Sequence, residues 1–237
     1  MITDLYSSLL SVSNRAVLKQ ELVSFADNLG FNHAVAFMTI RIAGTAKFRA
    51  MDVNNFSDAW KTSYRDEKLI ANDPVIQHSN NSNLPLVWNR ELYQKAGAAD
   101  LWEHLKRYNF DSGIAISMRD HLGNGYKIGL ARDQPLTSDP RELSRLVADA
   151  QLFGTFAQSA MNRIWNPAPE AEFAKLTARE LECLRWTMEG KTAWDIGIII
   201  GVCERTVNWH LGNASRKLVS DNKHAAVIKA IRIGLIS

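Results

Sequence analysis

Apolar residues in the first 165 positions of the chain recur mostly at the spacing of amphipathic helices. Leucine and phenylalanine follow this spacing from residue 4 onward until Gly30, a residue typical of a helix end. The apolar residues between 139 and 164 also gather on one side of a long helix. The pattern predicts helices over 4–29, 56–66, 71–80, 91–107 and 139–164.

Three shorter stretches have the composition of β-strands. Residues 33–40, with the sequence HAVAFMTI, are rich in β-forming side chains. Residues 113–118 and 126–131 predict two strands that are joined by a turn over 121–125. Helices that flank a few antiparallel strands make an α+β fold, so we expect an N-terminal α/β/α sandwich around an antiparallel sheet.

A proline-containing segment divides the chain. Residues 166–175, NPAPEAEFAK, contain two prolines that prevent a continuous helix, and the polar residues around them are typical of a linker. The expected organisation is an N-terminal domain over 1–165, this linker, and a purely helical C-terminal domain over 176–237.

The C-terminal segment carries the start and stop signals of four short helices. Thr177 followed by Glu180 predicts a capping box, and Gly190 predicts the end of that helix. The next helices are expected over 193–200, 204–219 and 222–234. The second and third are joined at Gly201-Val202-Cys203, which is the spacing of a helix-turn-helix.

The third of these helices has one apolar and one polar side. Its apolar residues repeat at helical spacing and predict a buried stripe of Val207, Leu211, Ala214 and Leu218. The polar side suits the major groove and the phosphates of DNA, although a small bundle with a solvated charged face has the same periodicity. The candidate DNA-binding residues are Lys191, Thr192, Arg205, Thr206, Asn208, Trp209, Asn213, Arg216 and Lys217. Trp209 is also compatible with packing on the scaffold of the domain.

The charge balance changes the picture in two steps. The chain carries 28 Lys and Arg against 25 Asp and Glu, a net charge of +3, which excludes a histone-like polybasic binder. Residues 175–237 carry 10 Lys and Arg against six acids and so hold a charge of +4. The positive charge therefore lies mostly in the predicted helix-turn-helix domain, and pairing two such domains would double the phosphate contacts.

Residues 56–88 combine aromatic side chains with one acid. Phe56, Trp60 and Tyr64 follow one another at helical spacing, and Asp73 lies before a proline among apolar neighbours. An aromatic stripe is more often core than ligand pocket, and an aspartate before proline is most often a helix cap. Together these residues also offer apolar walls with a few directed polar groups, which is the usual composition of a small-molecule pocket.

The run from LTARELECLRW to IRIGLI (176–236) resembles, without a gap, the C-terminal DNA-binding domain of LuxR-type transcription regulators. The matching residues include Glu180, Leu184, Gly190-Lys191-Thr192, Thr206-Val207-Asn208 and Gly234-Leu235-Ile236. In the family, the positions that match Asn208 and Gly212 often carry base-contacting side chains. Gly212 departs from this pattern, because glycine has no side chain and weakens a helix by about 1 kcal/mol. Asn208, Trp209 and Asn213 are therefore expected to carry more of the readout.

The N-terminal domain resembles the autoinducer-binding domain of the same family over residues 20–160. The six signature positions are occupied by Trp60, Tyr64, Asp73, Pro74, Trp88 and Gly113. By this resemblance, Trp60 donates its indole N–H to the carbonyl of a lactone ring, and Asp73 accepts the amide N–H of an N-acyl-homoserine lactone. Tyr64 and Trp88 wall the acyl chain and the ring. Trp102 resembles an aromatic position near the acyl tail and fits a plain core residue equally well.

Several positions depart from the family's pattern. Phe56 stands where many relatives have a tyrosine whose hydroxyl bonds the acyl-amide carbonyl, and Gly129 stands where a hydroxylic residue is common. Ala115 and Gly129 are expected to leave room for a bulkier or longer chain. Lys127 falls on the strand parity that faces the pocket, where a buried lysine is costly unless paired. Either the register slips, or Lys127 reaches the pocket mouth or a partner, or the ligand carries an acceptor for it.

The resemblance implies a transcription regulator of quorum sensing that needs no cofactor besides its signal ligand. We expect it to bind an N-acyl-homoserine lactone and, as a homodimer, a double-stranded inverted-repeat DNA operator, with RNA polymerase as a further partner. The alternatives are a regulator without its own synthase that senses a non-lactone small molecule, and one that binds DNA independently of ligand.

Other classes of protein are disfavoured by what the chain lacks. Its six histidines show no metal-ligand spacing, and we find no nucleophile elbow or phosphate loop, so an enzyme is not expected. The run 33–40 is followed by Arg41 rather than by the acids of a phosphoreceiver domain. No apolar run reaches the roughly 18 residues of a membrane span, no signal peptide is recognisable, and two cysteines cannot build a disulfide framework. A cytoplasmic protein is expected.

Overall fold

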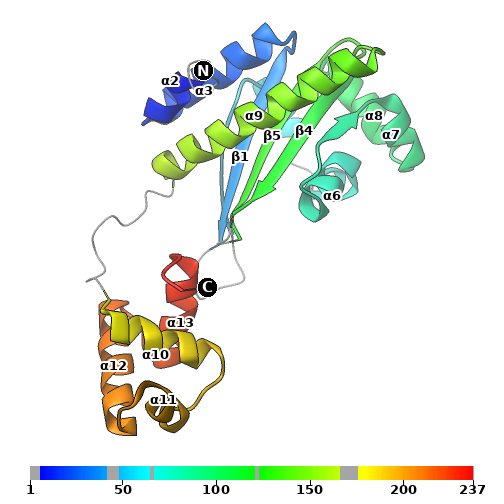
Figure 1. The fold of residues 1–237 in the computed structure, drawn as a ribbon. Coiled ribbons are helices and arrows are strands. Elements are labelled where there is room, and N and C mark those ends of the chain that lie inside the picture. Colours follow the sequence, from blue (N-terminus) through cyan, green and yellow to red (C-terminus); the bar gives the residue numbers. More distant parts are fainter. Residues whose placement is uncertain (1–5, 42–47, 65–66, 121–122, 166–175, 237) are drawn as a thin grey trace. The chain divides into compact units, whose positions relative to one another are not determined.

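The computed structural model describes residues 6–41, 48–64, 67–120, 123–165 and 176–236 of the chain. The chain divides into two compact units, Met1–Ala168 and Pro169–Ser237 (Figure 1). Each unit has a hydrophobic core of its own. Among the described helices, none is long and apolar enough to cross a membrane.

The described part of the N-terminal unit contains one open sheet in which all neighbouring strands are antiparallel. Its strands are β1 (His33–Arg41), β2 (Phe48–Asn54), β3 (Leu86–Trp88), β4 (Ser112–Arg119) and β5 (Gly125–Arg132), in the order β2-β1-β5-β4-β3. The prediction of β1, β4 and β5 is confirmed. The two edge strands were missed, because β2 begins with exposed residues and β3 is only three residues long.

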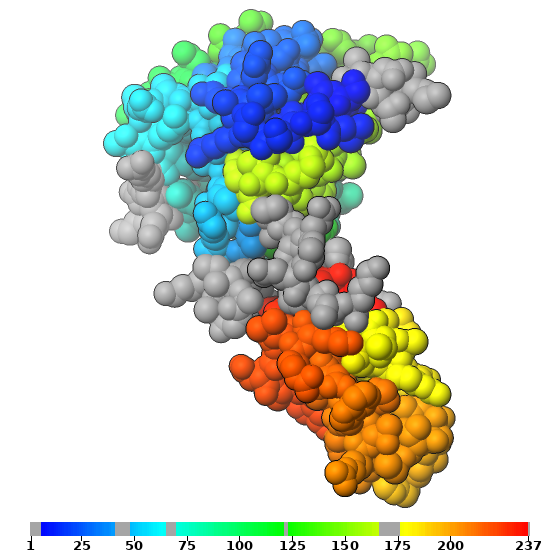
Figure 2. All heavy atoms as spheres, turned by 90° about the vertical axis from the view of Figure 1, so that its left-hand side faces the viewer, coloured from blue at the N-terminus to red at the C-terminus, as the bar shows by residue number. Residues whose placement is uncertain are grey.

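Three helices cover one face of this sheet. They are α2 (Ser7–Ser11), α3 (Arg15–Asn28) and α9 (Pro140–Trp165). Figure 2 shows α2 and α3, in blue, beside α9, in yellow-green. The long helix predicted over 139–164 is confirmed as α9. The single helix predicted over 4–29 is wrong, because Val12 is extended and the side chain of Asn14 starts a new helix by accepting the amide N–H of Val17 at 3.0 Å.

Shorter helices lie on the opposite face. They are α4 (Asp58–Ser63), α5 (Glu67–Asn72), α6 (Pro74–Asn81), α7 (Arg90–Lys95) and α8 (Ala99–Lys106). Side chains from α4, α7 and α8 form a second core cluster together with residues of β4 and β5. The single helix predicted over 91–107 is wrong, because the chain turns at Gly97, where φ is +69°. α5 was not predicted.

Strand alternation separates these two cores. In β4, Ile114 and Ile116 belong to the cluster beneath α3 and α9, whereas Ala115 belongs to the aromatic cluster on the other face. In β5, Ile128 and Ala131 divide in the same way. The sheet with helices on both faces is the α+β architecture that the sequence predicts.

The described part of the C-terminal unit consists of four helices, as predicted. They are α10 (Ala178–Met188), α11 (Ala193–Ile200), α12 (Glu204–Lys217) and α13 (Lys223–Arg232). The predicted capping box of Thr177 and Glu180 is present, and Thr192 and Asp195 form a second one. Gly201 ends α11 in the left-handed conformation at φ +71°.

Packing of α12 on its neighbours follows the predicted stripe. Val207, Leu211, Ala214 and Leu218 are all buried. The turn between α11 and α12 also needs a close approach of backbone to backbone, because a Cβ on Gly197 would lie 2.6 Å from the carbonyl oxygen of Val202.

Two glycines of the C-terminal unit should respond oppositely to alanine. Gly197→Ala is expected to destabilise the unit by about 1–3 kcal/mol, because the turn must move away from the new methyl group. Gly212→Ala is expected to stabilise it by roughly 1 kcal/mol, since a Cβ there meets no atom within 4 Å and alanine favours the helix. Chemical unfolding of the two full-length variants checks this pair, and a shift of the same sign in both would contradict it.

Candidate functional site

The predicted aromatic residues of the N-terminal unit meet in one cluster. It lies on the sheet face that the short helices cover, on the other side of the sheet from α9. Trp60 lies in α4, whose start is capped by Ser57 accepting the amide N–H of Trp60 at 3.2 Å. Its indole stacks on the ring of Tyr64, with centroids 4.6 Å apart. Phe56 lies before the helix and meets Trp60 edge-on at 6.5 Å. The three residues therefore gather as predicted, although only Trp60 is inside a helix.

Asp73 is the polar centre of this cluster. Its side chain is 4% exposed and caps α6 by accepting the amide N–H of Val75 at 2.8 Å. It also accepts the hydroxyl of Tyr93 at 3.2 Å and the hydroxyl of Tyr64. The backbone N–H of Ile76 also bonds this carboxyl, so Asp73 collects donors from the end of α4, from α6 and from α7.

Burial dominates the electrostatics around Asp73. It raises the pKa of the carboxyl above its usual range, against the hydrogen bonds from Tyr64, Tyr93 and the backbone of Val75 and Ile76, which lower it. Burial and the neighbouring carboxylate also raise the pKa values of Tyr64 and Tyr93, so both phenols remain protonated donors. The arrangement is a buried acceptor held in place by neutral donors.

Trp88 lies against the backbone of β4. It pairs with Gly113 in the β3–β4 ladder, and a Cβ on Gly113 would overlap both the indole of Trp88 and the carbonyl oxygen of Leu130. Tyr93 then bridges two tryptophans, with its ring centroid 6.2 Å from that of Trp88 and 5.5 Å from that of Trp102. Gly113 is required because only a residue without a side chain lets the indole approach this closely.

The small residues at the middle of the sheet differ in the space they leave. Ala115 and Gly129 are direct neighbours in the β4–β5 ladder and lie on the same face as the aromatic cluster. A Cβ on Gly129 would lie only 2.9 Å from the Cγ1 of Val35. Val35 therefore occupies part of the space that the sequence suggested would stay open beside Gly129.

Lys127 has a partner on α6. It pairs with Phe37 and Ser117 in the two ladders, so the register does not slip. Its ammonium group donates to the Oδ1 of Asn80 at 2.7 Å. Burial lowers the pKa of Lys127, and the nearby charge of Arg119 lowers it further.

Sequence reasoning missed several members of the cluster. Tyr93, which donates to Asp73 from a distance of 20 residues along the chain, is the most important. Phe110 and Tyr108 contact Trp60 with ring centroids 4.7 and 5.2 Å away. No local pattern marks these residues, because short helices and turns bring them together. In the described chain, no cluster of three His, Cys, Asp or Glu could hold a metal ion.

The predicted DNA-binding side of α12 lies open on the surface of the C-terminal unit. Asn208, Arg205 and Arg216 are exposed, and Trp209 is 62% exposed rather than packed on the scaffold. Thr206 and Asn213 are partly buried. Lys191 and Thr192 are exposed at the start of α11, where the Thr192 hydroxyl donates to Asp195 at 2.6 Å.

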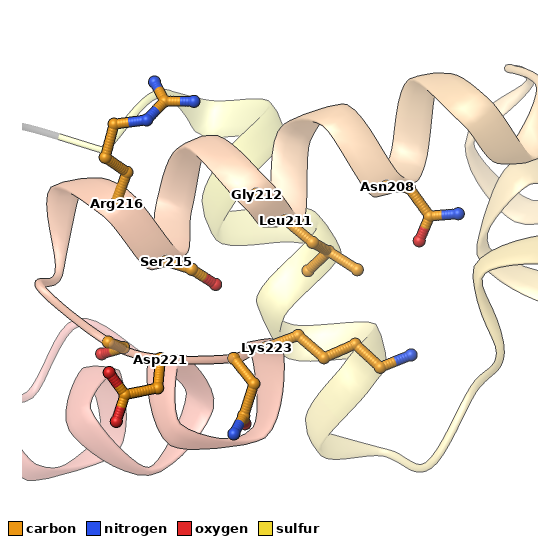
Figure 3. A pocket seen from close by; sticks show the side chains of 9 residues that line it. Asn208, Leu211, Gly212, Ser215, Arg216, Asp221 and Lys223 are labelled. Carbon is orange, nitrogen blue, oxygen red and sulfur yellow. The ribbon is translucent and has the colours of Figure 1, made fainter.

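A hollow of about 550 Å³ lies between α12 and the start of α13 (Figure 3). It is lined by Asn208, Leu211, Gly212, Ser215, Arg216, Ser220, Asp221, Asn222 and Lys223. The missing side chain of Gly212 contributes to this hollow, since a Cβ there would meet no neighbour. Polar groups therefore surround an open depression on the predicted DNA-binding side.

Lys217 differs from the other candidate DNA contacts because it is bound inside the unit. Its ammonium group lies 2.8 Å from the Oε2 of Glu180, which is 3% exposed and also accepts the amide N–H of Thr177. Burial alone would raise the pKa of Glu180, but the hydrogen bonds from Lys217 and Thr177 hold it below its usual value of 4.5. This ion pair ties α12 to α10 and so orients the exposed side of α12.

Residues 14–161 match the model of the autoinducer binding domain, and residues 174–230 match that of bacterial regulatory proteins of the luxR family. The chain is 36% identical over 234 residues to the transcriptional activator protein AnoR of Acinetobacter nosocomialis, with 98% of each chain covered. It is 32% identical over 236 residues to SolR of Ralstonia nicotianae, again with 98% of each covered.

The fold is also similar to that of a solved structure. The crystal structure of Escherichia coli SdiA superposes with a TM-score of 0.70 at 24% identity, covering 99% of this chain and 97% of that one. At this level of identity the likeness supports the architecture of the chain.

The ion pair of Glu180 should make the C-terminal unit sensitive to acid. Because the folded-state pKa of Glu180 lies below the usual value, its contribution is present above about pH 4.5 and is lost as the pH falls through the folded-state value. Glu180→Gln is expected to cost about 1.5–3 kcal/mol at neutral pH and to flatten this acid dependence. The matched control Glu182→Gln breaks only an exposed pair with Arg179 and should cost less than about 1 kcal/mol. The measurement is the free energy of unfolding of the full chain across the acid range. Equal losses in Glu180→Gln and Glu182→Gln would contradict this prediction.

Proposed function

This chain belongs to the LuxR family of bacterial transcription regulators, and we propose that it responds to an N-acyl-homoserine lactone in quorum sensing by binding an inverted-repeat operator as a dimer. Members of the family are regulators and not enzymes. The observation that carries the ligand proposal is Asp73, a buried carboxylate at the polar centre of a cluster of aromatic rings.

The chemistry of a lactone signal fits the aromatic cluster. The ligand amide N–H donates a further hydrogen bond to Asp73. The indole N–H of Trp60 bonds the lactone carbonyl, and the rings of Tyr64 and Trp88 enclose the lactone and the start of the acyl chain. Phe56 offers no hydroxyl to the amide carbonyl, which sets this site apart from that of many relatives. Trp102, Ala115 and Gly129 border the acyl tail.

Ligand and DNA act through the pairing of two chains. A signal that adds apolar contacts to the cluster stabilises the N-terminal unit by mass action. α13 exposes Ile228 at 51% and Ile231 at 38%, an apolar surface that a second copy would cover. Two-fold symmetry then presents two copies of α12 to a near-palindromic operator in the cytoplasm. RNA polymerase is the partner through which such a complex would act.

DNA recognition divides between bases and phosphates. Asn208 and Trp209 are exposed on α12 and are proposed to contact bases, together with Thr206 and Asn213. The proposed phosphate contacts are Lys191, Thr192, Arg205 and Arg216. Lys217 contributes mainly through its bond to Glu180.

A second candidate is a regulator that senses a non-lactone lipid. It is favoured by the absence of a hydroxyl at Phe56 and by the several donors that Asp73 already has within the described residues. One solved structure of similar fold is that of SdiA in complex with octanoyl-rac-glycerol. Acyl glycerol is therefore the appropriate competing probe.

The ligand proposal predicts a selective effect of Trp60→Phe. N-decanoyl-homoserine lactone at a hundredfold excess over its Kd is expected to stabilise the full-length protein by about 2.7 kcal/mol. Trp60→Phe keeps the apolar ring but loses the indole N–H, so affinity should fall roughly tenfold to a hundredfold. The control Trp194→Phe changes an exposed tryptophan of α11 and should bind normally. Thermal-shift titration checks this, and stabilisation by octanoyl glycerol but by no lactone would favour the second candidate.

The DNA proposal predicts different effects for two residues of α12. Sites selected from a random duplex pool should show relaxed base preference for Asn208→Ala, with about 1–3 kcal/mol of discrimination lost per half-site. Arg216→Ala should keep the preference but lower the slope of log K against log salt by about 0.9 per half-site. Lys95→Ala, in an exposed pair of the N-terminal unit, should change neither. Identical selected sites for wild type and Asn208→Ala would refute this division.

A further inference from the structure

The sheet face beneath the aromatic cluster carries three cross-strand rows of side chains. Ile116 and Ile128 belong to the core beneath α9, so the residues next to them in β4 and β5 point to the other face. The first two rows on that face hold the ladder neighbours Gly113 and Ala131, then Ala115 and Gly129. The third row holds Ser117 and Lys127. Small residues thus give way to a hydroxyl and an ammonium group along the same direction.

Ser117 is a buried polar group without a partner. Its side chain is 3% exposed, and its hydroxyl makes no hydrogen bond to any of the described residues. A buried hydroxyl without a partner costs about 1–3 kcal/mol, so such groups usually have a reason to remain. Its direct neighbour in the ladder is Lys127. The hydroxyl therefore has both a donor and acceptor positions to offer to a ligand.

Lys127, the neighbour of Ser117 in the third row, has N–H donors that its hydrogen bond to Asn80 does not use. Its ammonium group carries three N–H donors, and the structure gives it one hydrogen bond, to the side chain of Asn80. That bond would be explained if Lys127 only capped the end of α6. However, the exposed Arg119 already donates to the backbone carbonyl of Asn80. The end of α6 would therefore still have a cation bound to it if Lys127 were absent. Capping also leaves the hydroxyl of Ser117 unexplained.

The two polar points of this face are separated by the length of α6. Asp73 caps the start of that helix and Asn80 lies near its end. A rise of 1.5 Å per residue places them about 10 Å apart. Gly113 lies beneath Trp88. Along β4, the distance from Gly113 to Ser117 is about 13 Å at 3.3 Å per residue. A medium-length chain bound at Asp73 would therefore end near Ser117 and Lys127.

We propose that Ser117 and Lys127 form a second polar subsite, which binds a hydrogen-bond acceptor at the far end of the ligand's acyl chain. The proposal rests on the proposed function, because Asp73 must hold the amide at the other end. The ligand class is then an acyl-homoserine lactone whose tail ends in a hydroxyl or a carboxylate. The carboxylate uses the charge of Lys127, and either group satisfies the hydroxyl of Ser117.

The test compares three probes on the full-length protein. They are N-decanoyl-homoserine lactone, the same molecule with a hydroxyl on its last carbon, and the same molecule with a carboxylate there. Thermal-shift titrations should place the midpoint of at least one tail-modified probe about tenfold below that of the plain lactone. If the plain lactone binds and neither modified probe binds more tightly, the subsite is refuted while the proposed function stands. If none of the three binds, the proposed function fails and the subsite fails with it.

Variants separate a ligand contact from a structural role. Lys127→Met should abolish the preference for the carboxylate probe, and Ser117→Ala should abolish the preference for the hydroxyl probe. Arg119→Met, which removes the other cation at Asn80, should leave both preferences intact. Each readout is the ratio of the binding midpoints of two probes on the same variant. A general loss of stability affects both midpoints and so does not change this ratio. Ser117→Ala is nearly isosteric and serves as the test if Lys127→Met does not fold. Unchanged ratios in Ser117→Ala and in any folded Lys127→Met would overturn the proposal.

Discussion

The burial of one carboxylate organises the N-terminal unit. A carboxyl group inside an aromatic cluster is costly unless donors surround it, and Asp73 receives donors from three different places. Tyr64 comes from the end of α4, Tyr93 from α7, and the amide of Val75 from α6 itself. These short helices have little stability of their own. Their shared acceptor therefore holds them in position against the sheet and defines the polar centre of the candidate site.

The sheet makes this arrangement compatible with a stable core. Alternation along β4 and β5 sends branched aliphatic side chains toward α3 and α9, where they form a conventional core. The same alternation sends Gly113, Ala115 and Gly129 to the other face, where indole rings and aliphatic side chains approach the backbone closely. One strand can thus serve stability on one face and recognition on the other. In the C-terminal unit, the pair of Glu180 and Lys217 plays a comparable part, because it orients α12 from its buried side.

Much of the fold could be predicted from periodicity and helix signals. The four C-terminal helices follow from capping residues and glycines, because such signals act within one turn of the chain. The prediction of one helix over 4–29 failed because a single cap, Asn14, outweighed the continuing apolar pattern. β3 could not be predicted, since three residues show no period and pair only because β4 is already in place. Phe56, Trp60, Tyr64 and Asp73 were identified by spacing and resemblance.

What the sequence determined by itself is local: where the helices of the C-terminal unit begin and end, which side of α12 is apolar, and which residues match the family. Only the tertiary structure decided which polar groups meet. It joined Tyr93 to Asp73, Lys217 to Glu180 and Lys127 to Asn80, none of which lies within one helical turn of its partner. The physical reason is that a hydrogen bond extends about 3 Å, whereas the positions of its two groups depend on every element packed between them.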